Sequence, residues 1–147
     1  MATLQALAER FDCQDMAVAF PEIDIPVLTG MQRQGDILVV PSCLPEAWPT
    51  DGPVPMDGGV VITQSAFTDH THTMYGDGQV WVMNAEMRAT SLWCWDAPNT
   101  LAWLKVPDGG EAFLMHSDEH GALGIGPGTY RILRQQEFNN EWTDVED

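Results

Sequence analysis

The histidines of this chain are the residues whose type and spacing could do chemistry. All four fall in two short segments, His70 and His72 in one, and His116 and His120 in the other. Side chains at i and i+2 of an extended segment share a face, and residues at i and i+4 meet across a helical turn or a tight loop. Neutral imidazole is a common ligand for zinc and related divalent transition metals. The spacing predicts a metal site with these four ligands, the alternative being a hydrogen-bonded polar turn.

The second histidine segment also contains Glu119 and matches the H-x-x-E-H pattern of inverted zincin peptidases. That pattern requires a helix, in which the glutamate acts as general base. Here Gly121, Gly124 and Pro127 follow closely, and these residues disfavour a continuing helix. We therefore interpret the segment as a source of metal ligands rather than as a peptidase motif.

The overall charge restricts the classes of partner. The 147 residues include 22 acidic and 6 basic residues, which gives a formal net charge of -16. A nucleic-acid partner is disfavoured because binding phosphates requires clustered Lys and Arg. No apolar run is long enough to span a membrane and no signal peptide is evident. The three cysteines lack a paired spacing. We expect a soluble protein that is cytoplasmic or associated with a virion, and that binds other proteins in a larger or homo-oligomeric assembly.

The N-terminal segment is predicted to be a helix followed by an arm. Thr3 is available as N-cap, and the apolar stripe over residues 3–11 follows helical spacing. It consists of Leu4, Leu7, Ala8 and Phe11. Prolines at positions 21 and 26 then interrupt a weakly extended stretch that is unsuited to a central strand. We expect the helix and arm to be the docking element, with Leu4, Leu7 and Phe11 as interface residues.

From position 35 onward the chain shows short apolar runs separated by Gly, Pro, Asp and Asn, a pattern typical of β-strands. The expected strands are Asp36–Val40, Val60–Thr63, Gln79–Met83, Ser91–Trp95, Leu101–Val106, Ala112–Met115 and Thr129–Gln135. Helical patterns between them are missing, so we predict a mainly β fold, a small sandwich or barrel.

The C-terminal segment is acidic but contains Trp142. A large apolar indole is unfavourable in a fully solvated tail, so we expect Trp142 to lie at an interface. The predicted organisation is therefore a helix and arm over residues 1–34, a β domain over 35–138 and an acidic tail over 139–147.

One part of the chain resembles the cupins, which are metal-binding β-barrels. His70 and His72 match the first cupin motif, and Asp77 stands where the family has a glutamate. The glycine expected six residues before the first histidine is Gln64, and no histidine follows the turn at Pro127. This partial resemblance implies a metal held by the histidines, with Asp77 or Glu119 as acid-base group or as a second-shell residue.

A broader resemblance, over about two-thirds of the chain, is to a family of small uncharacterised bacterial and phage proteins. It rests on Gly35–Pro41, on His70–His72, and on the stretch from His116 through Gly128–Arg131 to Phe138. The resemblance implies that the two histidine segments belong to one site or one structural feature.

Two functions follow as hypotheses. The first is a non-enzymatic structural or interaction module, in concrete form a decoration or cement-like accessory protein of a bacteriophage head or virion. The second is a small cupin-like metalloenzyme that uses the four histidines. The residues around the histidines are small and polar, which predicts a solvated loop surface and favours the first hypothesis.

Overall fold

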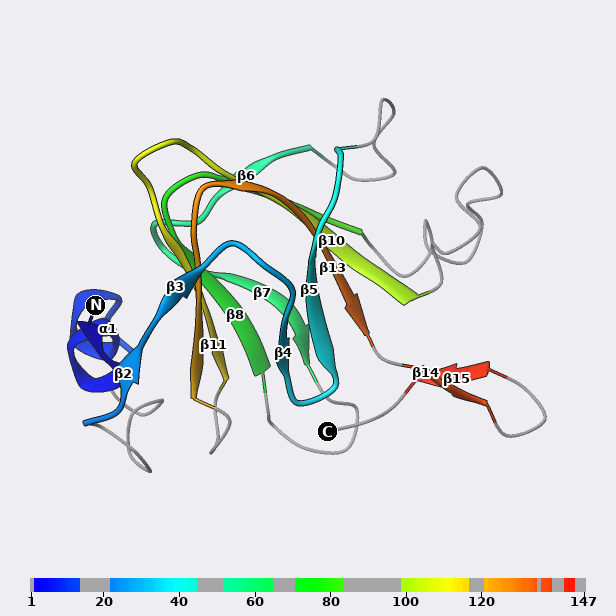
Figure 1. Cartoon of the computed structure of the whole chain (residues 1–147), viewed down its shortest axis with the longest axis horizontal. Coiled ribbons are helices and arrows are strands. Elements are labelled where there is room, and N and C mark those ends of the chain that lie inside the picture. The colour runs from blue at the N-terminus through cyan, green and yellow to red at the C-terminus, as the bar shows by residue number, and fades with distance from the viewer. Residues whose placement is uncertain are drawn as a thin grey trace.

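Most strands of this chain pair into two large β-sheets that face each other, and two further strand pairs, β1 with β2 and β14 with β15, lie outside them (Figure 1). The computed structural model describes residues 2–13, 22–44, 52–64, 71–83, 99–116, 121–134, 136–138 and 142–144. The N-terminal elements are β1 Ala2–Thr3, α1 Leu4–Arg10, β2 Asp24–Ile25, β3 Val27–Leu28, β4 Gln32–Gln34 and β5 Ile37–Pro41. The middle strands are β6 Val54–Pro55, β7 Val60–Gln64, β8 Thr71–Gly76, β9 Gln79–Val82 and β10 Thr100–Val106. The last are β11 Ala112–His116, β12 Ala122–Ile125, β13 Gly128–Arg134, β14 Gln136–Phe138 and β15 Trp142–Asp144.

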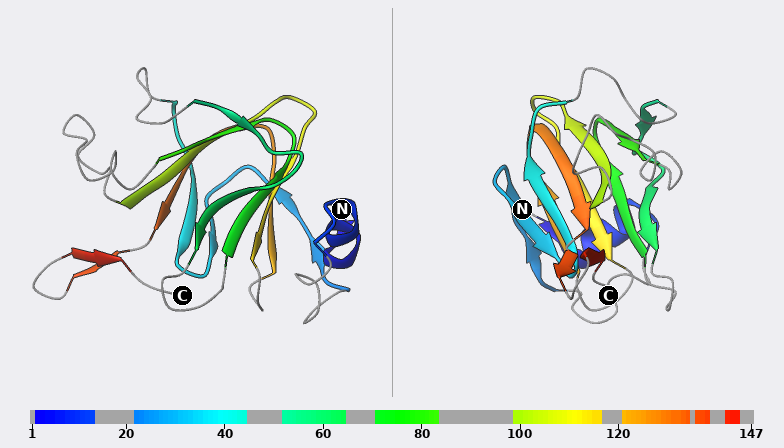
Figure 2. Two further views of the ribbon diagram at one scale, coloured as in Figure 1. Left: turned by 180° about the vertical axis from the view of Figure 1, so that it is seen from behind. Right: turned by 90° about the vertical axis from the view of Figure 1, so that its right-hand side faces the viewer.

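Among the described strands, the larger sheet has the order β4-β5-β13-β10-β9-β6 and the smaller sheet the order β3-β12-β11-β8-β7. The two sheets face each other across the core (Figure 2). Neighbouring strands run antiparallel, except that β3 is parallel to β12. The prediction of a mainly β sandwich with a short N-terminal helix is confirmed.

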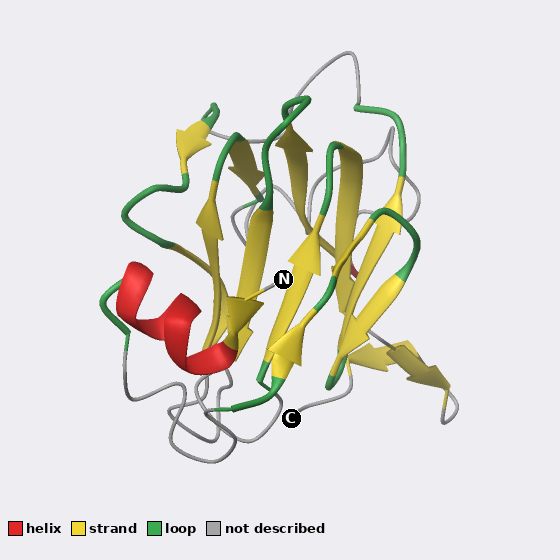
Figure 3. Cartoon of the chain, turned by 60° about the vertical axis from the view of Figure 1, so that its left-hand side comes forward, coloured by secondary structure: helices red, strands yellow, loops and turns green. Residues whose placement is uncertain are grey.

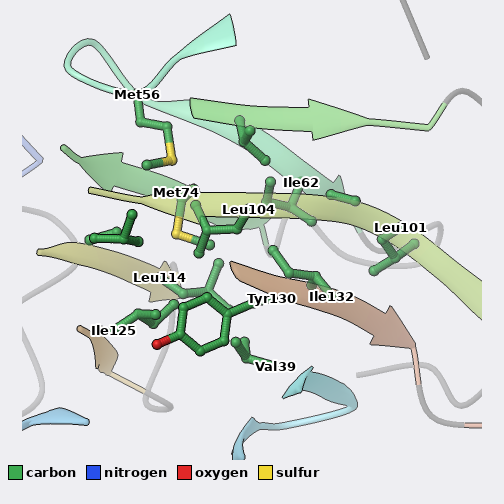
Figure 4. Close-up of a cluster of buried hydrophobic side chains, with 14 of the residues drawn as sticks. Val39, Met56, Ile62, Met74, Leu101, Leu104, Leu114, Ile125, Tyr130 and Ile132 are labelled. Carbon is green, nitrogen blue, oxygen red and sulfur yellow. The ribbon is translucent and has the colours of Figure 1, made fainter. Parts of the chain in front are cut away.

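The apolar core lies between the sheets and is built mainly from alternate residues of their central strands. Met74 and Leu114 point inward from the smaller sheet, and Leu104, Tyr130 and Ile132 point inward from the larger one (Figure 4). All five side chains are at most 1% exposed. Because side chains alternate along a strand, the residues two positions away from these five on the same strands also point inward.

Helix α1 covers the outer face of the smaller sheet (Figure 3). Thr3 caps it as predicted, because its Oγ1 accepts a 3.1 Å hydrogen bond from the backbone N–H of Ala6. Leu4 and Leu7, each 1% exposed, belong to a cluster with sheet residues that include Tyr75 and Phe113. The helical stripe thus packs on the chain's own domain.

The arm contributes edge strands to both sheets: β3 lies at the edge of the smaller sheet and β4 at the edge of the larger one. This position fits the proline pattern, which disfavours a central strand. At the opposite side of the molecule from α1, β14 and β15 form a hairpin (Figure 1). No helix in the described parts of the chain is both long and apolar enough to cross a membrane.

Six of the seven strands expected from the sequence lie close to observed strands, and Ser91–Trp95 falls outside the described residues. The expected solvated loop around the first histidine segment is wrong for Thr71, His72 and Thr73. These residues belong to β8, and His72 and Thr73 are buried. The physical reason is that two neighbouring strands hydrogen-bond the β8 backbone, so its polar composition does not expose it.

Candidate functional site

His72 and His116 lie opposite each other on adjacent antiparallel strands. They occupy the inward-facing rows of β8 and β11, two residues beyond Met74 and Leu114. Their ring centroids are 4.1 Å apart, with an angle of 53° between the ring planes. His72 is 3% exposed and His116 is fully buried. The fold therefore brings one histidine of each predicted pair together inside the sandwich.

Gln34 of β4 holds His72 in one orientation. Its Nε2 donates to the backbone carbonyls of Leu114, at 2.8 Å, and Gly121, at 3.2 Å. The amide oxygen therefore faces His72, and lies 2.8 Å from the Nδ1 atom of that residue. Because an amide oxygen only accepts, Nδ1 of His72 must carry the proton. The other ring nitrogen, Nε2, then faces Asp36.

Asp36 lies between two nitrogen-bearing side chains. Its Oδ1 is 3.6 Å from Nε2 of His72, and its Oδ2 is 3.6 Å from Nε of Arg134. Arg134, on the inward row of β13 after Ile132, also donates from Nη2 to Oγ1 of Thr63. Asp36 is 4% exposed and Arg134 is 9% exposed. We call Gln34, Asp36, His72, His116 and Arg134 the polar cluster.

The electrostatics of the polar cluster follow from this burial. A carboxylate removed from water is costly unless an opposite charge and hydrogen-bond donors compensate it. Arg134 is always charged and stands beside Asp36, so it supplies that compensation. The cluster can therefore act as a hydrogen-bonded, charge-compensated network that ties together β4, β8, β11 and β13.

The other predicted site residues are distributed as follows. His70, His120 and Glu119 lie outside the described residues. Asp77 is exposed and accepts a 3.1 Å hydrogen bond from the backbone N–H of Glu111. It follows the far end of β8, about 16 Å along the strand from His72. Asp77 is thus separated from the histidine pair.

Metal binding by the four histidines stays a prediction. Within the described ranges, no three His, Cys, Asp or Glu side chains are arranged so that they could hold a metal ion. The two histidines that the structure places, His72 and His116, are neighbours. The donors that would complete the predicted site, His70 and His120, are the ones that lie outside these ranges.

The predicted interface residues face inward where they are described. Leu4 and Leu7 are buried, and the ring of Phe11 stacks on Tyr75 at a centroid distance of 5.0 Å. Arg10 extends the same contact through a 3.1 Å ion pair with Glu111. Trp142 belongs to β15, but its side chain lies outside what the structure describes. The helix is therefore tied to its own sheet.

Sequence reasoning did not assign Gln34, Asp36 and Arg134 to the histidine site. Arg134 carried a signal, because it continues the alternation of Tyr130 and Ile132 and should point into the core. A charged residue at such a position needs a buried partner of opposite charge. Gln34 and Asp36 carried no comparable local signal.

Comparison with known proteins supplies a family. No curated protein and no solved structure matches the chain. One family model matches residues 33–135, a range that holds the whole polar cluster and the strands of both sheets from β5 to β13. Since this match covers more than half of the chain, the protein belongs to the family described as "Domain of unknown function (DUF8820)".

Proposed function

We propose that this protein is a non-enzymatic structural module that docks onto other proteins, with the polar cluster as an internal brace. The observation that carries the proposal is the burial of the histidine pair. His72 and His116 are at most 3% exposed, and Asp36 and Arg134 lie beside them in the sandwich interior. Catalysis requires a site that a substrate can reach, whereas a brace between strands requires burial.

The concrete form of the proposal is an accessory protein of a bacteriophage head or virion. Its support is the likeness in sequence to small bacterial and phage proteins, together with the strongly acidic composition. To test it, particles released by the cells that make this protein would be banded on a density gradient. We expect the chain to band with the particles. Recovery of all of it in the soluble fraction would reject this form of the proposal.

The second candidate is the cupin-like metalloenzyme, and the observation that favours it is the 4.1 Å contact between His72 and His116. Elemental analysis of protein purified without a histidine tag separates the two candidates. The brace predicts no stoichiometric metal, and predicts that His72→Ala and His116→Ala lower thermal stability. One equivalent of metal, together with a metal-dependent reaction lost in both variants while the fold is intact, would establish the metalloenzyme.

A further inference from the structure

The arm between α1 and β5 carries a concentration of exposed apolar side chains. Ile23 is 51% exposed, Val27 36%, Leu28 48% and Met31 69%. They are four of the six large hydrophobic residues that are exposed in the described part of the chain, and all four lie within nine positions. We call these four residues the arm surface. The four residues are close together in the sequence, on a segment that includes the edge strand β3, and exposed apolar side chains concentrated on one such segment typically mark a contact with another molecule.

The arm surface is held in place by backbone contacts. The backbone N–H of Gly126 donates to the carbonyl of Leu28 at 2.8 Å, and β3 pairs with β12 on the same side. Further along, Nε2 of Gln32 donates to the carbonyl of Gly124 at 2.7 Å. The exposed side chains therefore project from a backbone that is fixed before binding, which lowers the entropic cost of docking.

Charge determines which occupant fits. Glu22 and Asp24 are exposed on either side of Ile23, and the whole chain carries a net charge of -16. A second copy would bring the same carboxylates to the same patch, and two strongly acidic molecules repel each other, most of all at low salt. A partner bordered by Lys or Arg would instead be attracted to the same patch.

We infer that the arm surface binds a partner protein that presents apolar side chains bordered by Lys or Arg. The inference rests on the proposed function as a docking module, and it adds the surface and the chemistry of the partner. Apolar contact with Val27 and Leu28 supplies affinity, and the basic border meets Glu22 and Asp24.

A peptide of alternating lysine and valine is the probe. In extended form it presents valines on one face and lysines on the other. A peptide of alternating lysine and serine has the same charge without the apolar face. With fluorescently labelled peptides, we expect the lysine–valine peptide to bind the full chain at least about tenfold more tightly, since partial burial of two apolar side chains is worth about 1.4 kcal/mol.

Two variants locate the contact. The double substitution Val27→Ser with Leu28→Ser should remove the about tenfold preference for the valine peptide. The matched control is Val54→Ser with Val61→Ser, which changes exposed valines on the strands β6 and β7 at the other edges of the two sheets. It should keep the preference. Equal binding of both peptides by the wild type, or the same loss in both double variants, would overturn the inference.

Sedimentation tests whether a second copy of the chain, rather than a partner protein, binds the arm surface. The wild type should stay monomeric from low to high salt, whereas binding of the lysine–valine peptide should weaken as salt rises. Self-association that appears at high salt and disappears in the Val27→Ser, Leu28→Ser variant would identify a second copy as occupant and overturn the inference. Failure of this inference is separable from failure of the proposed function. If the wild type bands with particles and the double variant bands equally well, only the assignment to the arm surface fails.

Discussion

The two ends of the space between the sheets are built by the same strands with opposite chemistry. At one end, Met74, Leu114 and Ile132 belong to the apolar core. Two positions further along β8, β11 and β13, the inward residues are His72, His116 and Arg134. The pairing of β8 with β11 is regular through both ends, whereas the pairings of β10 with β13 and of β7 with β8 each shift register at the polar end.

This difference teaches that two kinds of specificity operate in one sandwich. The apolar end depends on volume, and a side chain of similar size can replace another at small cost. The polar end depends on partners, because each buried charge or donor must meet its complement. A change that keeps the shape of a side chain should therefore be tolerated at the apolar end, and should be damaging at the polar end when it removes a charge or a hydrogen-bond partner.

The largest effect is expected for Asp36→Asn, which keeps the shape of the side chain but leaves the buried Arg134 without its compensating charge. Removing one member of a buried ion pair costs about 3–5 kcal/mol. Urea unfolding measures the change in the free energy of unfolding. The matched control is Asp108→Asn, at an exposed turn carboxylate, with an expected change within about 0.5 kcal/mol. Equal stability of the two variants would show that the polar cluster does not depend on charge.

Leu114→Ala tests the apolar end. It creates a cavity beside Met74, and comparable buried leucines lose about 2–5 kcal/mol when they are truncated. The volume-conserving change Leu114→Met should cost less than about 1.5 kcal/mol. Thermal unfolding of both variants separates volume from partner effects. A Leu114→Met variant as unstable as Leu114→Ala would contradict the difference drawn between the two ends.

Gln34→Leu tests the side chain that connects the two ends. The change removes the amide that bonds to His72 and to the carbonyls of Leu114 and Gly121, and puts an apolar side chain of similar size in its place. Leaving such buried groups without this partner should cost about 2 kcal/mol. Chemical denaturation measures the loss, with Gln79→Leu at an exposed position of β9 as control. If Gln34→Leu is as stable as that control, the amide is not a structural clamp.

The smallest effect is expected for Tyr130→Phe. The phenol of Tyr130 donates to the carbonyl of Gly126 at 2.8 Å, and its loss should cost about 1 kcal/mol near neutral pH. Burial raises the pKa of Tyr130 above the ordinary value of 10.0. The unfolded chain therefore loses this proton first, so the contribution of Tyr130 is complete below pH 10.0 and is lost as pH rises through the folded pKa. Stability measured against pH should fall less steeply in this window for Tyr130→Phe than for the wild type, and parallel curves would contradict the assignment.

The sequence predicts the features that depend on local periodicity. The i, i+3, i+4 spacing of Leu4, Leu7 and Ala8 predicts α1, and the apolar alternation around Ile132 predicts β13. Local periodicity does not predict strand β8, because Thr71 and Thr73 are polar. Its burial results from pairing with β7 and β11 on either side. The partners of His72 could not be predicted from local sequence either, because tertiary packing alone brings Gln34 and Asp36 next to it.

The central place of β13 in the larger sheet affects how the chain is made. Strand β13 lies between β5 and β10, and pairs Tyr130 with Pro41 on one side and with Leu104 on the other. On the ribosome, β5 and β10 both emerge before the strand that must separate them. Contacts between residues so far apart in sequence form slowly, since a long loop must first close. The larger sheet therefore cannot be completed until residue 134 has left the exit tunnel, and an incomplete sheet with unpaired strand edges is the kind of intermediate that aggregates unless a chaperone holds it.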